Sequence, residues 1–136
     1  MMDSANVISE YPVRVYYEDV DLGGIVYHSK YLNFCERARS EIFFERGRSP
    51  VIGEYHFVVK HIDASFKAPA KFSDMLLVQT EFVKQRKASF TLRQRVVSEA
   101  GDRLYFVMEV ELVCLKGESV SIIPPGILEL FGIDSE

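Results

Sequence analysis

One segment with helical periodicity lies in a sequence that is otherwise patterned for β-strands. It restricts the possible folds more than any other feature. From Ser29 to about Gly47, apolar residues recur at intervals of three and four. Ser is a preferred helix N-cap, and Gly commonly ends a helix. The apolar stripe is Tyr31, Cys35, Ala38, Ile42 and Phe43, and the opposite face carries Glu36, Arg37, Arg39 and Glu41. The spacing predicts one helix of about four to five turns with one face to bury.

Alternating apolar and polar residues predict strands on both sides of this helix. One covers Val13 to Glu18, and the later ones are Phe57 to Ala68, Leu76 to Phe82, Phe90 to Val96 and Leu104 to Cys114. Tight connections at 85–88 and 99–102 indicate antiparallel neighbours. Pro124 and Pro125, before an apolar segment, predict a short closing helix. The predicted fold class is α+β, with an antiparallel sheet curled around the helix, which needs a sheet to cover its apolar face.

Composition sets the class of protein. The 136 residues are 48% hydrophobic without a linker or repeat, which predicts a single domain over residues 1–136. A net charge of −4 disfavours a nucleic-acid partner. The longest apolar run, Leu104 to Met108, is far shorter than the ~20 residues of a membrane span, and the N-terminus lacks a signal-peptide pattern. We therefore expect a cytoplasmic protein without a transmembrane segment.

The segment between the first strand and the helix is dense in side chains that can do chemistry. Asp19 and Asp21 precede the pair Gly23-Gly24, and His28 stands just before the helix. A helix N-terminus can stabilise an oxyanion, and a nearby carboxylate can act as nucleophile or general base. Acyl transfer or acyl hydrolysis fits this arrangement, although Asp-x-Asp before glycine is also ordinary turn chemistry.

The same segment does not predict a metal site. Read as a calcium loop, it has Lys30 at the position that requires a bidentate Glu. A transition-metal site built on Asp19, Asp21 and His28 would lack further strong ligands nearby. The two cysteines, Cys35 and Cys114, form no C-x-x-C pair.

These residues carry a family resemblance. The run from Val13 to Gly24, followed by Val26-Tyr27-His28 and Tyr31, resembles the signature of hotdog-fold acyl-CoA thioesterases. It is most similar to the Tol-Pal-associated YbgC-type group, related to 4-hydroxybenzoyl-CoA thioesterase. Weaker blocks extend the resemblance over nearly the whole chain, at 36–39, 66–70, 86–89 and 113–114.

The resemblance implies a fold and an activity. The fold is a hotdog, with a five- to six-stranded sheet wrapped around the long helix. The activity is hydrolysis of an acyl-CoA thioester to free acid and CoA. Asp21 would be the catalytic carboxylate, the His28 backbone N–H would polarise the carbonyl, and the His28 imidazole would be a further active-site group. Tyr17, Gly24, Tyr27 and Tyr31 would shape the substrate pocket. No metal or redox cofactor is expected. Coenzyme A takes part only as a portion of the substrate.

Partners follow from the same comparison. The family implies a homodimer or homotetramer. The predicted strand from Leu104 to Leu115 is apolar on both faces for much of its length, which also favours a partner. The basic cluster Lys84, Arg86 and Lys87 is either a site for the CoA phosphates or a solvated turn. Acyl carrier protein is a further possible partner. This chain departs from the family pattern at Val20, Leu22 and Ser73, where Thr, a small residue and Gly are commoner.

Three alternatives stay open from the sequence. A hotdog dehydratase would use a His with a carboxylate on the β-carbon of the substrate. A second thioesterase subtype places its carboxylate on the helix, where Glu36, Glu41 and Glu45 are candidates. A non-catalytic module would bind an acyl thioester or an acyl carrier protein without hydrolysing it.

Overall fold

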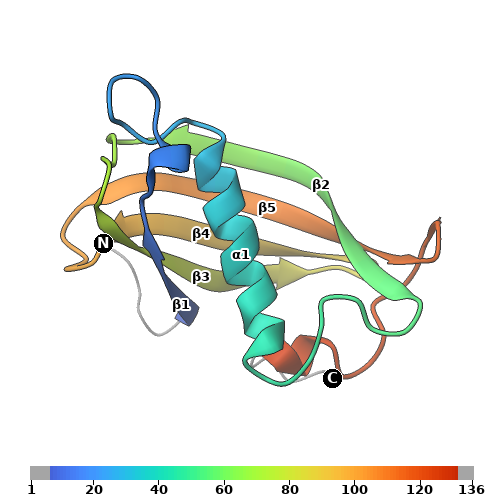
Figure 1. The fold of residues 1–136 in the computed structure, drawn as a ribbon. Helices are drawn as coiled ribbons and strands as arrows, with labels where there is room; N and C mark the ends of the chain where they lie inside the picture. The colour runs from blue at the N-terminus through green and yellow to red at the C-terminus, as the bar shows by residue number, and fades with distance from the viewer. Residues whose placement is uncertain (1–6, 132–136) are drawn as a thin grey trace.

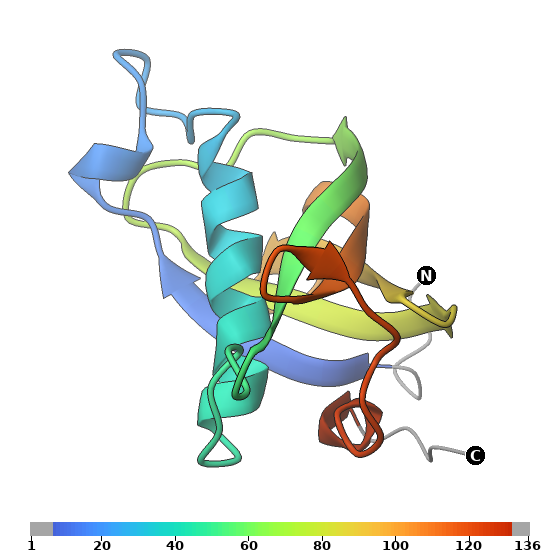
Figure 2. The same cartoon turned by 90° about the vertical axis from the view of Figure 1, so that its right-hand side faces the viewer.

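A computed structural model describes residues 7–131 of the chain as one antiparallel sheet that curls around one long helix (Figures 1 and 2). The strands are β1 (Val7–Arg14), β2 (Tyr55–Phe66), β3 (Met75–Gln85), β4 (Ser89–Ser98), β5 (Leu104–Lys116) and β6 (Ser119–Val120). The long helix is α1 (Lys30–Phe44), and two short 3-10 helices are η2 (Tyr17–Asp19) and η3 (Leu128–Phe131). The predicted α+β class and the hotdog architecture are confirmed.

The order of strands across the sheet is β1-β3-β4-β5-β2, with the two-residue β6 paired to the end of β5. The tight connections predicted at 85–88 and 99–102 join β3 to β4 and β4 to β5. Gly101 has a φ of 78° in the second of these turns, a backbone conformation that suits glycine. This order leaves β1 and β2 at the two edges of the sheet.

The apolar stripe of α1 is buried as predicted. Its buried residues are Tyr31, Phe34, Cys35, Ala38, Ile42 and Phe43. The helix ends as expected, because Gly47 has a φ of 68° and the Arg48 N–H donates back to the carbonyl of Phe43. Arg39 is a correction, since its guanidinium does not face solvent but donates to Oε1 of Gln94, a core residue of β4.

The first strand ends earlier than its alternation predicts. The strand stops at Arg14, and Tyr17 lies in η2 with 81% of its surface exposed instead of in a strand. The cause is local, because the Asp19 carboxylate accepts a hydrogen bond of 2.8 Å from the Tyr16 N–H and closes a turn there. The predicted closing helix is the single 3-10 turn η3, which buries Phe131.

Helix and sheet share one core. Phe34 of α1, Phe106 of β5 and Leu92 of β4 are completely buried within one cluster of apolar side chains. No helix among the described residues has the length and hydropathy to cross a membrane.

The stability of this core can be tested at one helical position. We predict that Phe34→Ala lowers the free energy of unfolding by about 3–5 kcal/mol, because it removes a fully buried ring. Leu32→Ala is the matched control on the same helix, since Leu32 is 36% exposed and should cost far less. Urea unfolding measures both values, and equal losses would contradict the packing described here.

Candidate active site

The segment between η2 and α1 is a small hairpin tied to the rest of the fold. Val20 and Val26 form an isolated bridge, and the Asp21 N–H donates to the carbonyl of Ile25 at 2.9 Å. The Gly24 N–H returns to the Asp21 carbonyl, and Gly24 has a φ of 79°, which favours glycine at this turn. Bonds to 70–72 hold the hairpin against the connection between β2 and β3.

The two carboxylates of the hairpin have different environments. Asp19 is 4% exposed, and one carboxylate oxygen accepts the Tyr16 N–H, so it bonds a turn amide. Asp21 is exposed, and its Oδ1 accepts the N–H groups of Gly23 at 2.8 Å and Ile25 at 3.4 Å. Within residues 7–131 nothing donates to its Oδ2. Asp21 is therefore oriented by backbone amides while one of its oxygens can reach a ligand.

Gly23 leaves room for the Asp21 carboxylate. A Cβ atom added there would lie 3.3 Å from Oδ1 of Asp21. That distance is tight, so a side chain at position 23 would press on the carboxylate that the Gly23 N–H orients. The glycine pair thus serves the geometry of Asp21.

The start of α1 offers a backbone donor. Ser29 occupies the N-cap position as predicted, but its side chain makes no capping hydrogen bond. The Lys30 N–H donates to the Tyr27 carbonyl, whereas the His28 N–H has no acceptor in the part of the chain that the structure describes. An N–H at this end also has the positive end of the helix dipole behind it. It is suited to bind an oxygen that gains negative charge.

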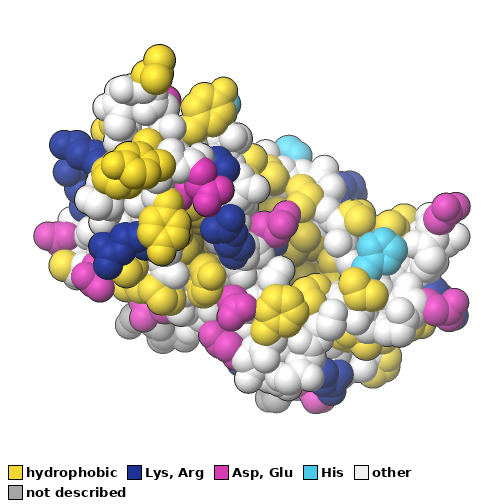
Figure 3. Space-filling model, viewed as in Figure 1, with side chains coloured by type: hydrophobic (Ala, Val, Ile, Leu, Met, Phe, Trp, Pro, Cys, Tyr) yellow, Lys and Arg dark blue, Asp and Glu magenta, His cyan; other side chains and the backbone are white. Residues whose placement is uncertain are grey.

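Aromatic side chains surround the hairpin. Tyr17, Asp21, Gly24 and Tyr27, four of the predicted site residues, line one surface depression of about 680 Å³ together with Val20, Leu22 and Phe72. The Tyr17 ring stacks on Phe72 with 4.3 Å between centroids. Figure 3 shows exposed apolar side chains gathered at this end of the molecule. The depression thus offers an acyl group an apolar surface beside the carboxylate.

Two predicted residues lie outside this depression. The His28 ring is 4.4 Å from the Tyr27 ring and 6.5 Å, edge on, from that of Phe66. Tyr31 is 2% exposed, its ring stacks on Phe106, and its hydroxyl accepts the Ala70 N–H at 3.1 Å. Burial raises the pKa of this hydroxyl. In a single chain Tyr31 supports the site from the core and does not line the depression.

Phe66, like Phe72, is a residue near the site that the sequence reasoning missed. It closes β2, is 56% exposed and contacts both His28 and Tyr31 by edge-to-face packing. Its membership in a block resembling the thioesterases was the signal that could have placed it near His28.

Ser73 departs from the family pattern at a position whose backbone conformation favours glycine. It stands where the resembled family commonly has glycine, and its φ of 72° is the one positive value at a non-glycine residue among the described residues. Its N–H donates to the Val15 carbonyl, and its own carbonyl accepts from Arg14. These bonds hold the strained residue in the connection that supports the hairpin.

The basic cluster lies at the other end of the sheet. The hairpin is anchored where β3 begins, since the Val15 N–H donates to the Asp74 carbonyl. The cluster lies at the far end of β3, with Lys84 near the end of the strand and Arg86 and Lys87 just after it. Eleven residues of strand separate the two ends by roughly 30 Å. A hydrogen bond from Ser89 and the nearby charges of Lys60, Arg86 and Lys84 lower the pKa of Glu111. A single chain does not bring this cluster to Asp21.

A curled antiparallel sheet around one helix, with a carboxylate hairpin before the helix, defines a hotdog-fold protein. The sequence model of the thioesterase superfamily matches residues 23–105 of this chain. The chain therefore belongs to the thioesterase superfamily. The match includes His28 and begins just after Asp21.

Individual relatives agree with this assignment. The chain is 42% identical over 108 residues to the acyl-CoA thioester hydrolase YbgC of Escherichia coli O6:H1, covering 77% of this chain and 80% of the relative. It is 45% identical over 83 residues to the acyl-CoA thioesterase YbgC of Helicobacter pylori, covering 61% and 62%. A probable thioesterase from Bartonella henselae has a crystal structure similar to this fold, with a TM-score of 0.78, 28% identity and coverage of 85% and 98%.

Proposed function

We propose that this protein hydrolyses acyl-CoA thioesters to a free acid and coenzyme A. The names of its YbgC relatives support this substrate class. The observation that carries the proposal is the pairing of an exposed, amide-oriented carboxylate at Asp21 with an unbonded backbone N–H at His28. Asp21 lies within the hairpin, and His28 follows it just before the start of α1. The reaction as proposed needs no metal or redox cofactor.

The mechanism begins with the thioester carbonyl at the helix start. The His28 N–H donates to the carbonyl oxygen and stabilises the negative charge that develops there. Asp21 then either attacks the carbonyl carbon or takes a proton from an attacking water. Collapse of the tetrahedral intermediate breaks the C–S bond and releases the CoA thiolate, which takes up a proton. In the first route, water hydrolyses the resulting mixed anhydride and regenerates Asp21.

The alternatives have weaker support. Glu36 lines a cavity that does not include the hairpin, and Glu45 is exposed beyond the C-terminal end of α1. A dehydratase would need His28 with a carboxylate at the β-carbon, yet the described hydrogen bonds of the hairpin orient Asp21 and not the imidazole. A binding module that engages acyl thioesters or acyl carrier protein would leave thioesters intact.

A homodimer completes the proposal, with a homotetramer as its larger form. The twelve-residue strand β2 is an edge of the sheet. Its outer backbone groups have no partner strand in the described chain, and such an edge favours pairing with a second strand. A second protomer is also needed to bring the basic cluster near Asp21, because the two lie at opposite ends of one chain.

The role of Asp21 can be tested by a charge-removing substitution. We predict that Asp21→Asn lowers kcat for acyl-CoA hydrolysis by about 10²–10⁴-fold, because Asn can act neither as nucleophile nor as general base. Folding and acyl-CoA binding should persist. Steady-state thiol release measures kcat, and thermal unfolding verifies the fold.

Two other carboxylates serve as controls. Asp19→Asn should reduce mainly stability, since Asp19 is buried against the turn, and Glu41→Gln should change little. A near wild-type rate for Asp21→Asn together with an inactive Glu36→Gln would transfer the catalytic role to the helix.

Charge reversal tests the basic cluster. If Lys84, Arg86 and Lys87 bind the CoA phosphates, Arg86→Glu and Lys87→Glu should raise KM for acyl-CoA with little change in kcat. Arg48→Glu, which changes an exposed cation in the loop after α1, is the matched control. An acyl thioester of N-acetylcysteamine, which lacks phosphates, should show no such rise. An unchanged KM for acyl-CoA at low salt would identify the cluster as a solvated turn.

The oligomeric state is a separate prediction. Light scattering at micromolar concentration should give the mass of a dimer or a tetramer, because the β2 edge and the apolar outer groups of β5 favour a partner. A monomer would contradict this and would leave the basic cluster remote from Asp21.

A further inference from the structure

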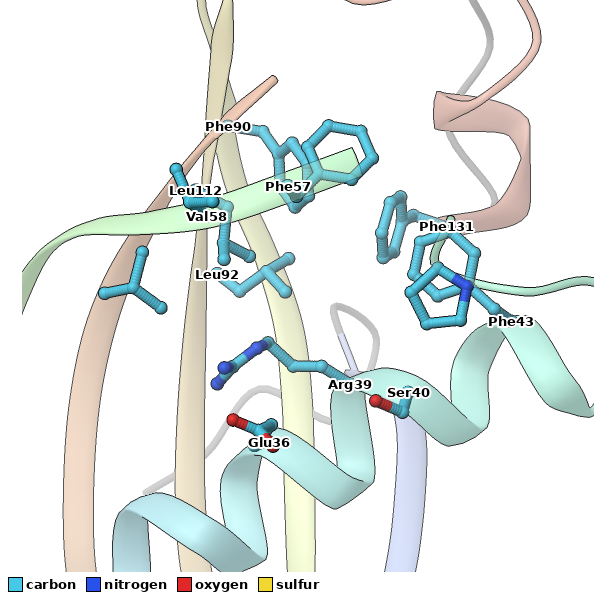
Figure 4. Close-up of a pocket in the computed structure, with 12 residues that line it drawn as sticks. Glu36, Arg39, Ser40, Phe43, Phe57, Val58, Phe90, Leu92, Leu112 and Phe131 are labelled. Carbon is cyan, nitrogen blue, oxygen red and sulfur yellow. The ribbon is translucent and has the colours of Figure 1, made fainter. Parts of the chain in front are cut away.

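A second cavity lies between α1 and β2, away from the hairpin. Its volume is about 370 Å³, and it shares no lining residue with the depression at Asp21. Its apolar part is formed by four phenylalanine rings and two leucines. These are Phe43, Phe57, Phe90, Phe131, Leu92 and Leu112. Figure 4 shows these rings gathered at one end, with Arg39 and Glu36 of α1 toward the other. The cavity is therefore apolar at one end and charged at the other.

The charged end is built around Arg39. Its guanidinium donates a hydrogen bond of 2.9 Å to Oε1 of Gln94, a neutral acceptor. The Gln94 amide nitrogen in turn donates to the Cys35 carbonyl at 3.0 Å and to the Thr80 hydroxyl at 3.1 Å, which fixes Gln94 in the core. The guanidinium is thus held in place by a side chain that carries no charge.

Arg39 has no close negative partner. Among the described residues no carboxylate lies within 4.0 Å of its guanidinium, and the nearby Glu36 is itself exposed. Burial lowers the pKa of Arg39, with smaller opposing effects from Cys35 and Glu36, as expected for a cation removed from water without an ion pair. A guanidinium with free donors at the edge of an apolar cavity favours an anion.

We propose that this cavity binds a small apolar carboxylate, with the carboxylate at Arg39 and the apolar part among the phenylalanine rings. The volume lies near the lower end of the ~300–1,000 Å³ typical of ligand pockets, so the ligand is a short aliphatic chain or one aromatic ring. Within one chain the cavity is separate from the proposed catalytic site, and the inference does not rest on thioesterase activity.

Binding of octanoate and benzoate to the whole protein tests the proposal, with 1-octanol as the uncharged probe. Calorimetry should show that at least one of the two carboxylates binds and that 1-octanol binds at least about tenfold more weakly than octanoate, since a hydrogen bond to a charged group is worth that much. Octanoate against benzoate distinguishes the aliphatic from the aromatic ligand. Amide chemical-shift changes should fall on residues that line the cavity, such as Phe57, Phe90 and Leu112, and not on the 17–28 segment.

Variants separate charge from fold. Arg39→Met keeps the packed stem and should weaken carboxylate binding about tenfold or more, and Arg39→Lys should restore part of it. Ser40→Phe, which adds a ring at the helix side of the cavity, should also weaken binding. Arg37→Met removes an exposed cation of the same helix that does not line the cavity, and should have no effect.

Four results would overturn the proposal. They are no binding of either carboxylate, equal binding of 1-octanol, chemical-shift changes confined to 17–28, and unchanged affinity in a folded Arg39→Met protein. Thermal unfolding identifies a variant that has not folded. In that case the comparison of carboxylates with 1-octanol and the chemical-shift mapping, both on the wild-type protein, test the proposal. Because none of these measurements uses hydrolysis, their outcome is independent of the proposed function.

Discussion

Burial of the apolar face of α1 in the curl of the sheet is the constraint on which the other features depend. The helix packs Phe34 and Cys35 against strands that are distant in sequence, and both side chains are fully buried. Gln94, in the middle of β4, adds a hydrogen bond between sheet and helix, because its amide nitrogen donates to the Cys35 carbonyl. Apolar burial supplies the stability, whereas this hydrogen bond fixes where along the sheet the helix sits.

The position of the helix determines the geometry of the site. Tyr31, in the first turn of α1, holds the connection between β2 and β3 through its hydroxyl, which accepts the Ala70 N–H. The hairpin around Asp21 is bonded to that same connection, since the Val26 N–H donates to the Ala70 carbonyl. The carboxylate loop and the helix start are therefore fixed to one short segment. This explains how an exposed loop can hold Asp21 in a definite orientation relative to the start of α1.

Periodic features of the sequence were predictable and irregular ones were not. The stripe of α1 and the alternation in β5 are set by burial, so their patterns are visible in the sequence. The end of β1 depends on a hydrogen bond from the Tyr16 N–H to Asp19, which alternation does not reveal. Arg39 lies at a helical position where the pattern predicts an exposed side chain, yet its guanidinium donates to Gln94 of a distant strand. The resemblance to a family predicted roles for Asp21 and His28, but the remoteness of Lys84 depends on the hydrogen bond from Val15 that anchors the hairpin at the start of β3.

The most direct test of the account is a crystal structure of Asp21→Asn bound to an acyl-CoA analogue whose sulfur is replaced by CH₂, which leaves the carbonyl in place. The account predicts the carbonyl oxygen about 2.7–3.1 Å from the backbone nitrogen of His28, with the side chain at position 21 beside the carbonyl carbon. A carbonyl that lies instead against Glu36 or Glu41, remote from the start of α1, would contradict it.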